Sequence, residues 1–241
     1  MAKLKVLLTG AAGRIGRHLV GPLQEAWDLR TLDRKPVPGD PGAVIADLGD
    51  RAALERAMQG IEVLVHLAAY PDEGPFLEEL VPNNVVGLYH TFEAARAAGV
   101  RRMVFASTCQ TVLGRKEPGV IFAHEPPQPC SLYGATKVLG EAMGRYYHNR
   151  HKLEFVAIRI GWFQPYDSES LRKRTWGGMN LWLSPRDSVK LLRCAAEKPG
   201  VGYAVVHGTS KTAVERLSLK EARELLGYEP EDDVNVLFPK E

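Results

Sequence analysis

Tyr133 and Lys137 are the residues whose types and spacing have the clearest chemical meaning. They stand four positions apart, so a helix would place both side chains on one face. An ammonium group beside a phenol stabilises the phenolate and lowers the pKa of the tyrosine. Such a pair can take the proton from a substrate hydroxyl near neutral pH. Taken alone, the spacing also fits a half-buried tyrosine beside a solvated lysine.

Three glycines, Gly10, Gly13 and Gly16, follow the first apolar run of the chain. Gly10 permits a tight turn, Gly13 lets a diphosphate approach the backbone, and Gly16 lets a helix pack closely on a strand. Glycine at a strand–helix turn often serves only to relieve the backbone, so the three are a weak signal by themselves. Their place between a strand and a helix favours a dinucleotide-binding loop.

Asp33 ends the second apolar run, 17 residues beyond Gly16. An acid at this place hydrogen-bonds the hydroxyls of an adenosine ribose and repels a 2′-phosphate, which favours NAD over NADP. Arg34 would by itself favour NADP, but the acid before it makes NAD the better interpretation. The alternative for Asp33 is a turn residue that closes a strand.

Residues that could contact a dinucleotide or a substrate also follow the later apolar runs. Asp47 and Leu48 follow the third run, residues 66–69 follow the fourth, and Ser107 and Thr108 close the fifth. The carboxyl ends of parallel strands meet at one edge of a sheet. We therefore expect these residues to lie beside the glycine loop.

The elements that must position these residues follow from the alternation of short β-branched runs with amphipathic stretches. The predicted strands are Lys5–Leu8, Leu29–Leu32, Ala43–Ala46, Val63–Leu67, Met103–Ala106, Phe155–Ile160 and Ala204–His207. The predicted helices are Gly13–Ala26, Arg51–Met58, Val85–Ala98, Leu132–His151, Ser184–Glu197 and Leu219–Leu226.

This order predicts an α/β fold with a doubly wound parallel sheet, which is Rossmann-like. Residues 1–161 would form the dinucleotide-binding core. After Gly161 the alternation becomes irregular, with prolines and glycines between short segments. We expect residues 162–241 to form a small C-terminal substrate-binding cap, packed on the same domain over the carboxyl ends of the strands.

Composition limits the remaining possibilities. The 241 residues are 45% hydrophobic and 25% charged, which is typical of a globular chain and excludes disorder. A net charge of +2 argues against a nucleic-acid partner, and no apolar run reaches the ~20 residues of a membrane helix. The N-terminus lacks the pattern of a signal peptide, and three cysteines without metal-like spacing suit reduced thiols. We expect a cytoplasmic protein with no membrane contact and no metal.

Together these motifs resemble the extended short-chain dehydrogenases/reductases, the branch named for NAD-dependent epimerases and dehydratases. The resemblance covers at least residues 4–161. It implies that Tyr133 is the catalytic acid/base and that Lys137 binds the nicotinamide ribose and tunes the tyrosine. It also implies that Thr108 orients the substrate hydroxyl, while Asn84 matches the family's helix asparagine, with Asn83 as the competing register. The residues expected to line NAD are Gly10, Ala12, Gly13, Arg14, Ile15, Gly16, Asp33, Arg34, Asp47, Leu48, Leu67, Ala68, Ala69, Asn84, Ser107, Tyr133, Lys137 and Ile160.

A closer resemblance extends through residues 140–148 and 181–187. These runs look like those of the uronate dehydrogenases and the haloarchaeal NAD-dependent glucose-6-phosphate dehydrogenases. Members of this subgroup oxidise the anomeric carbon of a sugar to a lactone. The resemblance therefore implies a sugar or sugar-acid substrate, with an anionic sugar among the candidates.

The departures from this subgroup all fall on the substrate side. Cys109 and Gln110 stand where the subgroup has Asn-His, and Trp162 replaces a small residue. The carboxylate-binding arginine has no clean counterpart, although Arg172 or Arg174 would serve if the loop shifts. The expected substrate contacts are Thr108, Cys109, Gln110, Trp162 and Arg174. For Cys109, the alternative role is a buried small apolar filler, and the cluster 172–174 fits a solvated loop equally well.

Two other functions share the cofactor motifs. A sugar-nucleotide epimerase needs a larger C-terminal lobe than the roughly 80 residues after Gly161 provide. A non-catalytic dinucleotide-sensing protein commonly loses the tyrosine or the lysine, and this chain keeps both. We therefore expect an NAD-dependent dehydrogenase. The resemblance also implies a homodimer built on the helix 132–151.

Overall fold

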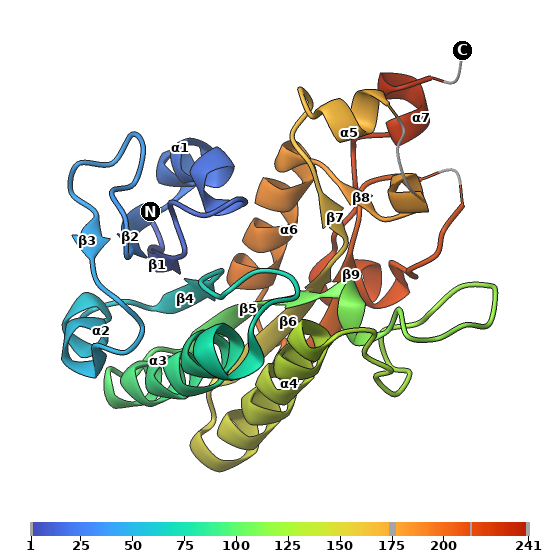
Figure 1. Ribbon diagram of the computed structural model, residues 1–241. Helices are drawn as coiled ribbons and strands as arrows, with labels where there is room; N and C mark the ends of the chain where they lie inside the picture. Colours follow the sequence, from blue (N-terminus) through green and yellow to red (C-terminus); the bar gives the residue numbers. More distant parts are fainter. Residues whose placement is uncertain (1, 174–176, 213, 240–241) are drawn as a thin grey trace.

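The computed structural model describes residues 2–173, 177–212 and 214–239. At its centre is a seven-stranded sheet in the order β3-β2-β1-β4-β5-β6-β9, with all neighbouring strands parallel (Figure 1). The strands are β1 (Lys5–Thr9), β2 (Asp28–Asp33), β3 (Val44–Ile45), β4 (Val63–His66), β5 (Arg102–Thr108), β6 (Glu154–Ile160) and β9 (Tyr203–Gly208). This confirms the doubly wound parallel sheet and each strand predicted from the sequence. The strand order reverses between β1 and β4, where ligands of such sheets bind.

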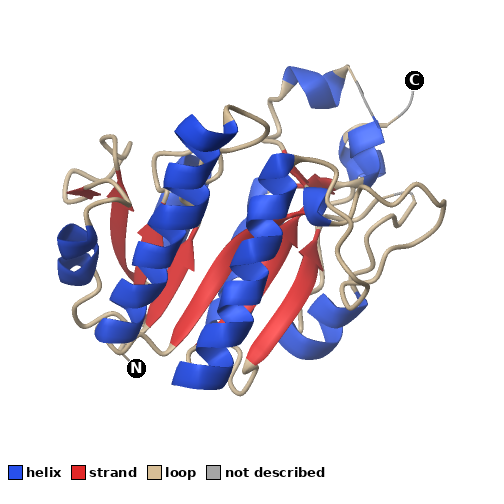
Figure 2. Cartoon of the chain, turned by 60° about the horizontal axis from the view of Figure 1, so that its bottom comes forward, coloured by secondary structure: helices blue, strands red, loops and turns tan. Residues whose placement is uncertain are grey.

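Helices cover both faces of the sheet (Figures 1 and 2). Val6 and Leu8 of β1 pack in one apolar cluster with the helices of one face, and Leu7 packs in the cluster of the other face. This alternation is the period-2 pattern of a strand buried on both sides. On the first face lie α1 (Gly16–Ala26) and α6 (Pro185–Glu197), and on the second lie α2 (Arg51–Ala57), α3 (Gly87–Ala97) and α4 (Leu132–His151).

The segment before α3 differs from the sequence prediction. Helical structure begins at Phe76, in the π-helix η1 (Phe76–Val86), and not at Val85. Pro82 offers no N–H to the helical ladder, and the N–H of Gly87 donates five residues back to the Pro82 carbonyl. The sequence prediction assumed the periodicity of an ordinary α-helix. It therefore did not recognise the wider turns of η1, and the predicted helix was too short.

Of the described residues after Gly161, β9 joins the main sheet, and α6 packs in the apolar cluster on its first face. Ser184 caps α6, which begins within one residue of the predicted helix start, and its Oγ accepts the N–H of Asp187 at 3.0 Å. Trp182 is fully buried and therefore packs in the core. The smaller elements are β7 (Trp162–Phe163), α5 (Glu169–Arg172), η3 (Gly177–Asn180), β8 (Trp182–Leu183), η4 (Ala222–Leu226) and α7 (Val234–Leu237), with β7 pairing with β8. Over the described residues, every helix is too short or too polar to span a bilayer.

Candidate active site

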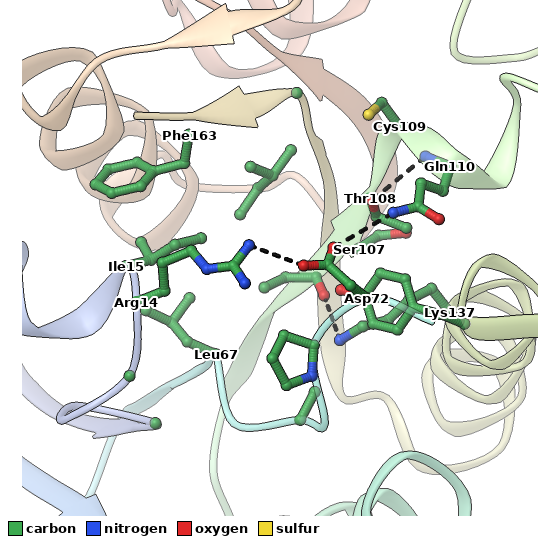
Figure 3. A pocket seen from close by; sticks show the side chains of 18 of the residues that line it. Arg14, Ile15, Leu67, Asp72, Ser107, Thr108, Cys109, Gln110, Lys137 and Phe163 are labelled. Atoms are coloured by element: carbon green, nitrogen blue, oxygen red, sulfur yellow. Dashed lines mark hydrogen bonds and ion pairs between the residues drawn. The ribbon is translucent and has the colours of Figure 1, made fainter. Parts of the chain in front are cut away.

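A cavity of about 1450 Å³ opens at the carboxyl edge of the sheet (Figure 3). It runs from the loop after β2 across the glycine loop to the residues that follow β5 and β6. Pockets for single drug-sized ligands are about 300–1,000 Å³. The cavity therefore has room for a dinucleotide and a second, smaller molecule.

The glycine loop is shaped so that side chains do not fit. Gly10 has a φ of +74°, and a Cβ there would lie 2.6 Å from the backbone nitrogen of Ala68. A Cβ on Gly16 would lie 2.3 Å from the carbonyl oxygen of Gly10. Among the described residues, no side chain caps α1 at Ile15, so N–H groups at this helix start remain for an anion. The loop fits the diphosphate of a dinucleotide.

Asp33 is held against the same loop. Its Oδ2 accepts the N–H of Ala12 at 3.0 Å, and its Oδ1 accepts the N–H of Lys35 at 3.0 Å. The carboxylate lines the cavity at the end of β2. This location suits an acceptor for ribose hydroxyls, while the two N–H donors also give Asp33 the turn role named as its alternative.

Tyr133 and Lys137 meet in the cavity from the first two turns of α4. Ser131 caps this helix, its Oγ accepting the N–H of Gly134 at 2.9 Å. Lys137 is 3% exposed, and its Nζ donates to the carbonyl of Ala106 at 2.9 Å. The same Nζ lies 5.6 Å from the centre of the Tyr133 ring. The predicted pair is thus brought together on one helix face.

The pKa values of this pair differ from the sequence prediction. Burial raises the pKa of Tyr133 above its usual value, and the negative charge of Asp72 adds to the rise. Burial also lowers the pKa of Lys137 to about 7. Loss of water around both groups outweighs the attraction of the ammonium for a phenolate. The lowering of the Tyr133 pKa that the sequence predicts is therefore not produced by the protein side chains alone.

Some residues at the end of β5 and just after it line the cavity, and others pack in the protein interior. Ser107 donates to Glu141 Oε1 at 2.6 Å, whereas Thr108 lines the cavity and its hydroxyl accepts the N–H of Gln110 at 3.3 Å. Cys109 is buried among apolar side chains, and burial raises its pKa to about 12. It touches the cavity but behaves as the apolar filler named as its alternative.

Asn84 lies behind the main cavity and not in its lining. Its side chain accepts the N–H of Tyr70 at 2.7 Å and donates to the Tyr70 carbonyl at 3.1 Å and to Thr136 at 3.2 Å. Asn83, the competing register, lines the cavity. Asn84 therefore joins the loop after β4 to α4 and supports the wall of the cavity.

The other predicted residues are placed as follows. Trp162 lines the cavity from β7. Arg172 ends α5 and is exposed away from the lining, and Arg174 lies outside the described residues. All remaining residues expected at NAD line the cavity, namely Gly10, Ala12, Gly13, Arg14, Ile15, Gly16, Asp33, Arg34, Asp47, Leu48, Leu67, Ala68, Ala69, Ser107, Tyr133, Lys137 and Ile160.

Four charged residues of the cavity wall were not predicted from the sequence: Lys35, Asp72, Glu215 and Arg216. Asp72 forms an ion pair with Arg14 at 2.9 Å across the opening (Figure 3). Lys35, Glu215 and Arg216 also line the cavity. Asp72 follows a Tyr-Pro pair and reads as an ordinary turn, so its only local signal is a backbone φ of +62° that the sequence does not reveal. In the part of the chain that the structure describes, no group of acidic, His and Cys side chains is arranged to hold a metal ion.

Fold, glycine loop and Tyr–Lys pair together define a nucleotide-dependent oxidoreductase, and comparison with known proteins agrees. Residues 6–165 match the NAD dependent epimerase/dehydratase family. The chain belongs to this family, and with it to the NAD-dependent oxidoreductases of the extended short-chain dehydrogenase/reductase type.

Individual relatives match nearly the whole chain. It is 35% identical to the NAD-dependent glucose-6-phosphate dehydrogenase of Haloferax volcanii, over 95% of this chain and 93% of that enzyme. It is 36% identical to the uronate dehydrogenase of Pseudomonas syringae, over 98% and 85%. The solved structure of an Agrobacterium tumefaciens uronate dehydrogenase mutant complexed with NAD superposes with a TM-score of 0.85, at 30% identity, over 98% of this chain and 87% of that one. By contrast, a UDP-glucose 4-epimerase of Streptomyces lividans matches over 64% of this chain and 50% of that enzyme.

Proposed function

We propose that this protein oxidises a hydroxyl of a sugar or sugar acid, at the anomeric carbon, with NAD as the hydride acceptor. The observation that carries the proposal is the meeting of Tyr133, Lys137 and Thr108 in the same cavity as the glycine loop and Asp33. The dehydrogenases that match over the whole chain support the sugar class.

In this proposal the Thr108 hydroxyl holds the substrate hydroxyl and the Tyr133 phenol group takes its proton. Lys137 is enclosed below the tyrosine ring, so its ammonium charge acts at short range in a dry environment. When bound, NAD supplies the hydride acceptor and a positive ring charge, which favours the phenolate. Gly10, Gly13 and Gly16 hold the diphosphate, and Asp33 accepts from the adenosine ribose. Asn84 acts through the wall, by fixing the loop after β4 on α4.

We also propose that the protein is a cytoplasmic homodimer that binds no nucleic acid. The three cysteines are free thiols, which suits a reducing compartment. Leu132, Leu139 and Tyr146 are exposed on α4 and Tyr89 on α3, and these apolar side chains suit contact with a second copy. The net charge of +2 offers no field for nucleic acid.

The test of the proposed activity is NADH formation by the purified protein. The panel contains glucuronate, galacturonate, glucose 6-phosphate and the neutral parent sugars of each. We expect reduction of NAD with at least one of these, and a lactone as the product. Binding of NAD without reduction by any member of the panel would contradict the proposal.

A further inference from the structure

Asp72 lies at the substrate end of the cavity on a backbone that few residues adopt. Its φ is +62°, in the left-handed region, which costs free energy for a residue other than glycine. Its Oδ2 contacts Arg14 at 2.9 Å, and its Oδ1 lies 3.5 Å from Gln110 Nε2 (Figure 3). The loop after β4 therefore holds a carboxylate over the cavity, next to the residue that follows Thr108 and Cys109.

The orientation of the Gln110 amide is fixed by its other partner. Ser131 Oγ accepts the N–H of Gly134, so its single hydrogen is donated to Gln110 Oε1, at 2.5 Å. The amide oxygen therefore faces Ser131, and the NH₂ group faces the cavity and Asp72. The substrate end thus presents an amide donor beside a carboxylate acceptor. Their separation of 3.5 Å is a long contact, which leaves both groups free to bind a third partner.

The cations at this end donate N–H groups to the described chain, although only Arg14 has a charged partner. Arg216 donates to the carbonyls of Glu117, Gly119 and Arg115. Lys137 donates to the carbonyl of Ala106, and Arg14 is paired with Asp72. Glu215 adds a second carboxylate to the wall. The ion pair of Asp72 is 53% exposed on the acid side and hence weak, so its carboxylate can take a hydroxyl donor.

We propose that Asp72 and Gln110 recognise neighbouring hydroxyl groups of the sugar, and that Asp72 sets a preference for a neutral aldose over the matched sugar acid or phosphate. This inference rests on the proposed function. A hydroxyl donates to the carboxylate and accepts from the amide, so a vicinal diol satisfies both groups. A carboxylate or phosphate of the substrate at the same place meets a like charge and offers no proton.

The test is Asp72→Asn, which removes the charge and changes little else. Asparagine has nearly the same size, tolerates positive φ and keeps one acceptor oxygen. We expect the ratio of kcat/KM for glucose over glucuronate, at saturating NAD, to fall about tenfold in the variant. The same fall is expected for glucose over glucose 6-phosphate. Glu55→Gln is the control, because Glu55 forms a comparable exposed pair with Arg51 at 2.8 Å on α2.

The outcomes separate this inference from the proposed function. A wild-type protein that oxidises neutral aldoses better than sugar acids, together with the fall in Asp72→Asn alone, supports the inference. Oxidation of sugars with a ratio that stays within about twofold of wild type overturns the inference and leaves the proposed function in place. A wild-type protein whose kcat/KM is higher for the sugar acid than for the neutral aldose also overturns the inference and leaves the proposed function in place. Absence of sugar oxidation overturns the proposed function and this inference with it.

Discussion

At the scale of single residues, burial of Lys137 in the site lowers the free energy of unfolding of the protein. An ammonium group enclosed by protein has lost its water, and here it donates a hydrogen bond to the Ala106 carbonyl. Burial accordingly lowers its pKa from 10.5 to about 7. Between these two values the unfolded chain binds a proton that the folded chain lacks. The free energy of unfolding therefore rises with pH across this window, and below pH 7 the full cost of burying the charge remains.

We predict that Lys137→Met raises the free energy of unfolding at about pH 6 by roughly 1–3 kcal/mol, because an apolar side chain replaces a buried cation. The gain shrinks at about pH 9, where the wild-type lysine is already neutral in the folded state. Sugar oxidation is lost in the same variant. Urea unfolding at both pH values measures the effect. Equal destabilisation at both would show that Lys137 packs as a stabilising cation.

Residue type and local spacing were enough to predict the Tyr–Lys pair, the glycine loop and Asp33. Asp72 was out of reach, because its place over the cavity depends on the path of a loop whose partners, Arg14 and Gln110, are 58 and 38 residues away. Arg216 was missed for a similar reason, since it contacts the cavity from a segment far along the chain. Side chains set by tertiary contacts leave no periodic signal.

At the scale of elements, α4 is bound to β6 through a buried charge network. Arg159 of β6 contacts Glu141 of α4 at 2.9 and 3.0 Å, and Ser107 of β5 donates to the same carboxylate. Glu141 and Arg159 are 5% and 3% exposed. Gly144 adds to this contact, because a Cβ there would lie 2.2 Å from the Phe155 ring. The helix that carries Tyr133 is thus fixed against the two strands beneath the site.

We predict that Glu141→Gln lowers the free energy of unfolding by about 3–5 kcal/mol, since it leaves the Arg159 guanidinium buried without a countercharge. Glu55→Gln, which breaks an exposed pair, is expected to cost no more than about 1 kcal/mol. Urea denaturation compares the two variants. A similar small loss in both would mean that water or another group replaces the buried pair.

The elements themselves were well predicted from apolar periodicity, with η1 as the main error. A period of 3.6 residues describes α3 and α4 but not a turn widened at Pro82. Within this segment Asn83 lines the cavity, whereas the side chain of Asn84 contacts Tyr70 and Thr136 behind it. Prolines inside a helical pattern mark where such errors arise.

At the scale of the whole molecule, the exposed apolar side chains of α4 suit a dimer. Tyr146 is 57% exposed, Leu132 50% and Leu139 39%. We predict that Tyr146→Glu converts the dimer to a monomer, because a charge then faces the apolar surface of the second copy. Val236→Glu is the control, since Val236 is 75% exposed on α7. Sedimentation velocity at several concentrations measures the state. A wild-type monomer, or a dimer that persists in Tyr146→Glu, would contradict this interface.

The central claim is that Tyr133 removes the proton of a sugar hydroxyl inside the NAD-binding cavity. Its most direct test is Tyr133→Phe, with NADH formation on the best sugar measured beside the dissociation constant of NAD. The phenol oxygen is lost while the ring and its contacts remain. We predict a fall in kcat of about 10²–10⁴-fold with NAD affinity retained within roughly threefold. A variant that binds NAD and still oxidises the sugar at the wild-type rate would contradict the account.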